Sequence, residues 1–162
     1  MAFSTLFLTV SCSQDVEVEN TNEESIDNFK LTKVSDISGL KPSQILSFEC
    51  ELITSKPEVA TPFCADFGIA IWDISWSTWS ADGALGKGLY TTNDCDPDCA
   101  SGKIYRTSVD LKMEGLYTDG SRYFLRYLNF KADDQLPLAQ TNSGKWDVAD
   151  FYLDSPWMRS DD

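Results

Sequence analysis

The chain has 162 residues, a formal net charge of −13 and no histidine, and 42% of its residues are hydrophobic. Such an acidic chain lacks the clustered Lys and Arg that displace counterions from phosphate backbones, which argues against nucleic-acid binding. The absence of histidine excludes Ser-His-Asp and Cys-His catalysis, His-ligated zinc or copper, and an imidazole pH switch. No stretch approaches the ~20 apolar residues of a membrane-spanning helix.

Residues 1–12 are expected to be the end of a bacterial export signal. Residues 6–8 are apolar, and the small residue Ser11 precedes Cys12. The segment resembles bacterial lipoprotein signals, in which such a cysteine is lipidated, although Thr9 stands where those signals usually have Leu and no Lys or Arg precedes the apolar run. The alternatives are an ordinary signal peptide cleaved near Ser11 and a frayed N-terminus. Lipidation of Cys12 predicts a protein on the extracellular side of the cell membrane, held by two or more acyl chains, whereas cleavage predicts a secreted protein.

Residues 13–39 are predicted to form an acidic, flexible linker. The segment is polar and has no sustained period, and its like charges repel one another. Its early acidic residues are Asp15, Glu17, Glu19, Glu23, Glu24 and Asp27. About 120 residues then remain, enough for one compact domain. We assign residues 40–138 to the domain core and 139–162 to a C-terminal edge segment and tail.

The domain is predicted to be all-β. Residues 45–53 and 103–113 alternate apolar and polar side chains, the period of a half-buried strand. In the first segment Leu46, Phe48, Cys50 and Leu52 share the apolar face, and Ser47, Glu49 and Glu51 share the other. Residues 67–77 change phase, which predicts a bulge or a strand crossing between sheets.

Two features extend this pattern towards the C-terminus. Residues 121–131 are aromatic-rich on both faces, as in a central strand, and Tyr117-Thr-Asp-Gly120 predicts the hairpin turn before them. No segment holds an apolar helical period over three turns. The expected fold is a small, disulfide-containing antiparallel β-sandwich preceded by a disordered acidic tether.

Four cysteines lie in the domain. Export would place them in an oxidising compartment, where Cys50, Cys64, Cys95 and Cys99 are expected to form two disulfides. The turn sequence Asp-Pro-Asp separates Cys95 from Cys99, and a polar, proline-containing loop separates Cys50 from Cys64. We favour these two pairings, while the other two connectivities stay open. Closing a loop of about fifteen residues stabilises the fold by about 3 kcal/mol.

The middle of the chain carries a series of short motifs. Cys64-Ala-Asp66, Trp76-Ser-Thr-Trp79, the spaced Ala84, Gly86 and Gly88, and Cys95-Asp-Pro-Asp-Cys99-Ala-Ser-Gly102 follow in this order. The series resembles a group of small secreted proteins and lipoproteins common in actinobacteria, over roughly residues 57–130. Asp98 stands where that pattern has Asn, and Cys50 is not one of its standard cysteines. The resemblance implies a small disulfide-containing β domain, and it carries no activity because the members are largely uncharacterised.

Metal binding is weakly indicated. The domain cysteines are separated by thirteen, thirty and three residues, unlike the paired knuckles of a Cys₄ zinc site. Asp94, Asp96 and Asp98 alternate like the first ligands of a calcium loop, but Cys99 and Tyr105 stand where such a loop needs Gly and Glu. An acidic, disulfide-capped turn is the favoured interpretation. We therefore expect no cofactor and keep calcium as the alternative.

Ligand binding is the remaining hypothesis. Trp72, Trp76 and Trp79 suit either a core or a carbohydrate platform, with core roles favoured for at least two of them. Trp76 and Trp79 are the candidate ligand-binding residues, and if any of the three is exposed for binding, it is expected to be Trp79, which lies among Ser and Thr. We interpret the chain as a cell-surface protein that binds an envelope glycan or protein, or is a structural envelope component, and not as an enzyme. The alternatives are a carbohydrate-binding module and a histidine-free glycan-active enzyme with paired carboxylates.

Overall fold

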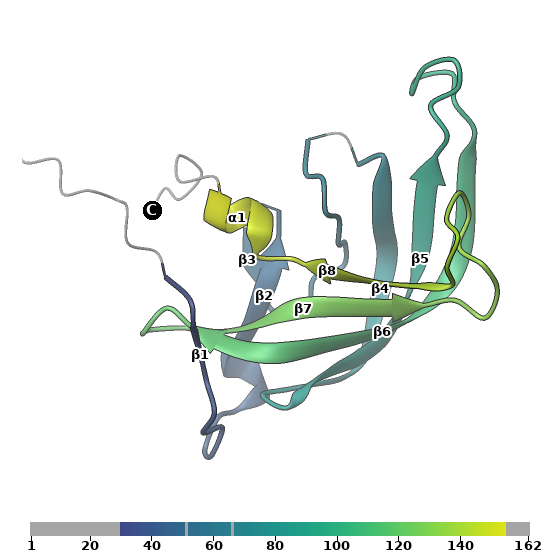
Figure 1. Ribbon diagram of the computed structural model, residues 1–162. Helices are drawn as coiled ribbons and strands as arrows, with labels where there is room; N and C mark the ends of the chain where they lie inside the picture. Colours follow the sequence, from purple (N-terminus) through teal and green to yellow (C-terminus); the bar gives the residue numbers. More distant parts are fainter. Residues whose placement is uncertain (1–29, 51, 66, 155–162) are drawn as a thin grey trace, which may run out of the picture.

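The computed structural model describes residues 30–50, 52–65 and 67–154. Over these residues the chain is built almost entirely of β-strands, as Figure 1 shows. The elements are β1 (Thr32–Lys33), a 3-10 turn (Pro42–Gln44), β2 (Ile45–Glu49), β3 (Leu52–Thr54), β4 (Ile69–Ser80), β5 (Gly83–Asn93), β6 (Ile104–Thr118), β7 (Tyr123–Lys131), β8 (Ser143–Asp147) and α1 (Asp150–Asp154). The all-β prediction is confirmed.

The strands form one curled sheet in the order β3-β2-β7-β6-β5-β4, with β1 paired to β6 and β8 paired to β7. All strand pairs are antiparallel except β2–β7, so the sheet is mixed. Figure 1 shows the long strands β6 and β7 bending, with β2 and β4 rising on either side. The curl brings the end of β4 to the start of β2, where the buried Trp79 Nε1 donates to the Ile45 carbonyl at 2.9 Å.

The segment 45–53 forms two short strands instead of one. Cys50 adopts a positive φ of 53° and is bonded to Cys64, so the chain turns between β2 and β3. Ser47, expected on the polar face, is fully buried, and its hydroxyl donates to the Leu125 carbonyl at 2.9 Å. Leu52, expected on the apolar face, is 63% exposed. The turn at Cys50 therefore ends the alternation that the sequence suggested.

The phase change in 67–77 is a bulge, as predicted. The β4–β5 register shifts between Trp72 and Ser75 and again between Trp76 and Thr78. The partner strand β5 escaped the sequence analysis because its inner face carries very small residues. A Cβ on Gly88 would lie 2.5 Å from Ile71 Cγ2, and one on Gly86 would lie 2.7 Å from the Ser75 carbonyl oxygen. These glycines let β5 approach β4 where larger side chains would collide.

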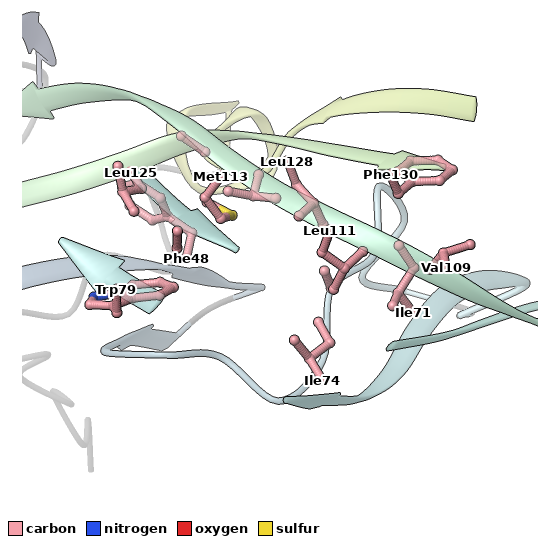
Figure 2. Packing of buried hydrophobic residues seen from close by; sticks show 14 of the residues in the cluster. Phe48, Ile71, Ile74, Trp79, Val109, Leu111, Met113, Leu125, Leu128 and Phe130 are labelled. Carbon is pink, nitrogen blue, oxygen red and sulfur yellow. The ribbon is translucent and has the colours of Figure 1, made fainter. Parts of the chain in front are cut away.

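The core lies inside the curl and is shown in Figure 2. Its centre contains Phe48, Ile71, Met113, Phe124, Leu125 and Leu128, each at most 1% exposed. The alternation predicted for 103–113 is confirmed: Val109, Leu111 and Met113 are buried between exposed neighbours. The predicted central strand is β7, which pairs with β6, β2 and β8. The predicted hairpin turn joins β6 to β7, with Gly120 at a φ of 100°.

The two ends of the described chain also join the fold. Part of the expected linker is structured, because β1 pairs with β6 and the nearby Leu31, Val34 and Ile37 pack against the core. The C-terminal segment adds β8 to the sheet, as predicted, and then α1, whose Tyr152 packs against Phe48 with ring centroids 5.2 Å apart. The export signal, Cys12 and the tether over 13–29 lie outside the described residues.

Candidate ligand-binding pocket

A pocket of about 350 Å³ opens beside the start of β4. Described residues at the end of β2 and the start of β3 form one wall, and described residues of the loop between β3 and β4 form another. Its described lining residues are Glu49, Cys50, Leu52, Val59, Thr61, Cys64, Phe67 and Trp72. The predicted Cys50–Cys64 disulfide is present and joins the two walls. The pocket is thus held by a covalent link and lies at the lower end of the ~300–1,000 Å³ range of small-molecule sites.

The loop is also fixed to the edge of β4 by backbone hydrogen bonds. Ala60 and Ile71 exchange two of them, at 2.9 and 2.7 Å. The Thr61 hydroxyl donates to the Ile69 carbonyl at 2.7 Å and accepts from the Phe63 amide at 3.1 Å. Because these bonds hold the loop against the strand, the pocket is formed without a ligand.

Two aromatic side chains dominate the mouth of the pocket. Phe67 and Trp72 lie with ring centroids 5.4 Å apart and planes at 33°. They are 38% and 36% exposed, and the neighbouring Phe63 and Leu52 are 56% and 63% exposed. Exposed large apolar side chains that gather around one hollow are typical of a binding surface, whereas scattered ones are not informative. The backbone turns at Phe67 itself, which has a positive φ of 51°, and at Asp73, which follows Trp72 and has a positive φ of 52°.

The predicted ligand-binding tryptophans lie elsewhere. Trp79, expected to be exposed, is only 6% exposed, which corrects the prediction. Its ring packs against Trp76 with centroids 5.1 Å apart at 68°, and both indole nitrogens donate to backbone carbonyls, those of Ile45 and Pro57. The register shift after Trp76 turns both rings to the same side, so alternation misplaces them. Trp72 is the most exposed of these three indoles, and Figure 2 shows Trp79 within the core.

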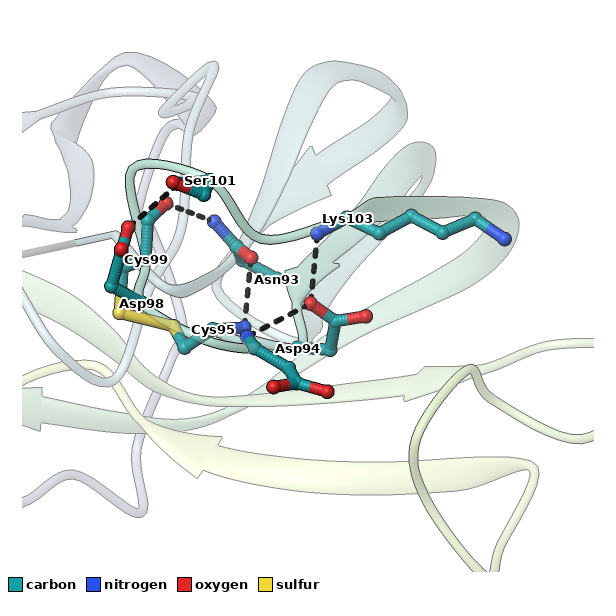
Figure 3. Close-up of a disulfide and its surroundings, with 8 residues drawn as sticks. Asn93, Asp94, Cys95, Asp98, Cys99, Ser101 and Lys103 are labelled. Atoms are coloured by element: carbon teal, nitrogen blue, oxygen red, sulfur yellow. Dashed lines mark hydrogen bonds between the residues drawn. A yellow bond between two sulfur atoms is a disulfide. The ribbon is translucent and has the colours of Figure 1, made fainter.

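The second predicted disulfide, Cys95–Cys99, closes the loop between β5 and β6, shown in Figure 3. Its polar groups bond to one another. Asn93 accepts from the Cys95 amide at 3.0 Å and donates to the Cys99 carbonyl at 2.8 Å. Asp94 accepts from the Lys103 amide and Asp98 from the Ser101 amide, each at 2.8 Å.

These hydrogen bonds explain the carboxylates of the loop. The bond from the Lys103 amide lowers the pKa of Asp94, and the bond from the Ser101 amide lowers the pKa of Asp98. The carboxylates of Asp94 and Asp98 cap the turn by accepting from backbone amides. Among the described residues no three Asp, Glu, Cys or His side chains are placed to hold a metal ion. The loop fits the acidic, disulfide-capped turn that the sequence favoured over calcium.

Two further hollows lie on the outer face of the sheet and share Leu85, Asp110 and Leu111. Lys87 forms an ion pair with Asp110 within this lining, and Lys112 and Lys145 pair with Glu114, which lies outside it. In each of the three hollows, the described lining includes a single carboxylate, Glu49 or Asp110. None of these three hollows therefore shows, among its described lining residues, the paired carboxylates that a glycan-active enzyme would need.

Comparison with known proteins adds no assignment. Neither a family model, nor a curated protein, nor a solved structure matches this chain. Within the described residues, no helix is both long and apolar enough to cross a membrane. The two disulfides indicate a non-cytoplasmic environment.

The pocket residues Glu49 and Phe67 could not be recognised as such from the sequence. Glu49 belonged to a regular alternation, and Phe67 stood at the start of a predicted strand. One signal was available: apolar residues at 63 and 67 flank Cys64 inside a loop bounded by Pro57 and Gly68. Large apolar residues in such a loop have few core positions to fill.

Proposed function

We propose that this is an exported protein, anchored through lipid on Cys12 at the extracellular side of the cell membrane, that acts by binding a ligand in the Trp72 pocket. The observation that carries the proposal is the exposed Phe67–Trp72 pair over a pocket closed by the Cys50–Cys64 disulfide. A structural envelope component has no need of a preformed apolar pocket, whereas a binding protein does.

A cell-envelope carbohydrate is the first ligand class to test, since indole faces stack on the apolar faces of sugar rings. Trp72 offers such a face at 36% exposure, and Glu49 supplies a hydrogen-bond acceptor in the same pocket. This moves the carbohydrate-binding hypothesis from Trp76 and Trp79 to Trp72. The acidic segment before the domain would then serve as a spacer from the membrane.

The experiment is a binding measurement on the full chain with purified soluble cell-wall glycan and with washed cell-envelope fragments. Wild type is compared with Trp72→Ala and with Leu85→Ala, a matched truncation of a side chain that is 50% exposed on the outer sheet face. We expect the Trp72 variant to lose at least one of the two binding signals and the Leu85 variant to keep both. Equal binding by all three proteins would reject the pocket as the site.

The anchor is tested separately by intact mass. Protein recovered from its native cells should begin at Cys12 with a diacyl or triacyl mass, and its four domain cysteines should alkylate only after reduction. Replacement of Cys12 by Ser should release the protein from the membrane fraction. A mass that retains Met1, with free thiols throughout, would contradict export.

A further inference from the structure

We propose that the Trp72 pocket recognises a small cation with an apolar body, of the quaternary-ammonium class. The inference rests on the proposed binding function and adds the chemistry of the ligand. Three features of the described chain support it: the aromatic faces are not covered by a protein cation, the pocket contains a carboxylate without a counter-ion, and the pocket has the size of a single head group.

The first feature is a contrast between two aromatic pairs. Tyr117 and Tyr127, on β6 and β7, are covered by the protein's own cations: Arg126 lies 5.1 Å from the Tyr117 ring centroid and Lys145 lies 4.4 Å from that of Tyr127. Within the described chain no Lys or Arg covers Phe67 or Trp72 in this way. An exposed indole face attracts cations within ~6 Å of the ring centroid, and Trp does so more strongly than Tyr or Phe. Trp72 therefore leaves this interaction to a ligand.

The second feature is charge. Glu49 lines the pocket and is partly buried, and it forms no ion pair with any described residue. No basic side chain occurs among the described lining residues, and the whole chain carries a net charge of −13. A partly buried carboxylate gains from a cation placed beside it, while an anionic ligand would be repelled. The pocket is therefore complementary to positive charge.

The third feature is size and lining. About 350 Å³ holds a head group rather than an extended chain. Apart from Glu49 and Thr61, the described lining is made of apolar or disulfide side chains, and the Thr61 hydroxyl is engaged with Ile69. A strongly hydrated ammonium would lose its water here and find one carboxylate, Glu49, among the described lining residues to accept its hydrogen bonds. A methylated ammonium carries its charge on an apolar surface, which suits both the rings and the carboxylate.

The test uses choline and its neutral carbon isostere, 3,3-dimethylbutan-1-ol, with the change in tryptophan emission of the full chain as the readout. We expect choline to bind roughly tenfold more tightly than the isostere, because only choline gains the cation–π and carboxylate interactions. Glu49→Gln should reduce choline affinity several-fold and leave the isostere unchanged. Trp72→Phe should remove most of the emission change that choline causes. The emission of Trp79, which is buried in the core, should not respond to choline.

The outcomes separate the ligand class from the proposed function. Equal binding of choline and the isostere would overturn cation recognition. A choline affinity that Glu49→Gln leaves unchanged would overturn it as well. Either result would leave an apolar binding pocket standing. A tryptophan emission that choline does not change would also overturn cation recognition. The proposed binding function would then be tested by the measurements with cell-wall glycan and envelope fragments. Co-sedimentation of the Cys12→Ser protein, which lacks the proposed acyl chains, with phosphatidylcholine vesicles but not with phosphatidylglycerol vesicles would assign the head group to a lipid. Binding of free choline alone would assign a soluble ligand.

Discussion

The two disulfide-closed loops differ in how they treat their own side chains. In the Cys95–Cys99 loop the polar groups of Asn93, Asp94 and Asp98 are bonded to backbone inside or next to the loop. The Cys50–Cys64 loop instead exposes Phe63 and borders the exposed Phe67 and Trp72. Both loops contain a disulfide, so the disulfide itself does not mark a site. Under the proposed function, the Cys95–Cys99 loop serves stability, and the Cys50–Cys64 loop, which displays apolar surface around a hollow, serves binding.

The largest predicted effect separates the two tryptophan environments. Trp79→Ala should lower the free energy of unfolding by about 3–5 kcal/mol, because it leaves a core cavity and removes the donor to Ile45. Trp72→Ala should cost only about 1 kcal/mol, because the side chain is 36% exposed. Urea unfolding followed by circular dichroism measures both. Equal losses would show that Trp72 is a core residue and would remove the contrast.

The next effect distinguishes the disulfides. Replacing Cys50 and Cys64 by Ser opens a loop with a sequence separation of 14; the free energy of unfolding should fall by about 3 kcal/mol. Replacing Cys95 and Cys99 opens a loop with a separation of 4, and should cost about 2 kcal/mol. Only the first pair should also weaken ligand binding, because it joins the pocket walls. Loss of binding in the second variant would connect the Cys95–Cys99 loop, whose Asn93 amide donates to the Gly68 carbonyl at 3.0 Å, to the site.

A pH effect tests the self-satisfied turns at Asp119. Burial alone would raise the pKa of Asp119, but hydrogen bonds from the Ser121 and Arg122 amides and the Arg122 side chain outweigh it and lower the pKa to about 2 from 3.8. A carboxyl group whose pKa is lower in the folded state stabilises the fold at every pH above its unfolded-state pKa. This contribution is lost as the pH falls towards the folded-state pKa of about 2.

Asp119→Asn should therefore lower the free energy of unfolding by about 2 kcal/mol at neutral pH. The gap to wild type should close as acid protonates the native carboxyl. Asp110→Asn is the control, since its ion pair with Lys87 is exposed to solvent and should contribute little to stability. A gap for Asp119→Asn that persists in acid would mean that the turn depends on shape and not on charge.

The smallest effect concerns Asp94. Its pKa is lowered by the bond from the Lys103 amide, so Asp94→Asn should reduce the melting temperature slightly at neutral pH, by less than Asp119→Asn does. Ligand binding should not change. Adding a calcium chelator to wild type should leave the melting temperature where it was. A fall with the chelator would restore the calcium alternative for Asp94, Asp96 and Asp98.

Much of the fold could be predicted because the long strands have a clean period. Val109, Leu111 and Met113 alternate with charged residues, and this period directly places them in the core. The segment 45–53 shows the same period but breaks at Cys50, because the disulfide to Cys64 and a positive φ are tertiary constraints. The sequence of β5 shows no clear apolar alternation, because Gly86 and Gly88 occupy positions where a Cβ would collide with β4.

The site could be predicted only in part. The preference for a binding protein pointed to the Trp-rich strand, which does border the pocket through Trp72. The Ser and Thr residues around Trp79 then favoured that residue, but Trp79 is only 6% exposed and packs against Trp76, next to a register shift in β4. The pairing of Phe67 with Trp72 depends on how a loop folds back on a strand edge at Ala60 and Ile71. No local pattern encodes that contact.

The most direct test of the central claim is a ¹H–¹⁵N spectrum of the tryptophan indole groups, assigned with Trp72→Phe and recorded with choline and with soluble cell-wall glycan. We predict that one of these probes shifts the Trp72 signal in proportion to its concentration. The Trp79 signal should stay in place and exchange slowly with solvent, because its indole N–H is buried and bonded to Ile45. A Trp72 signal that neither probe moves, or a Trp79 signal that moves instead, would contradict the assignment of binding to this pocket.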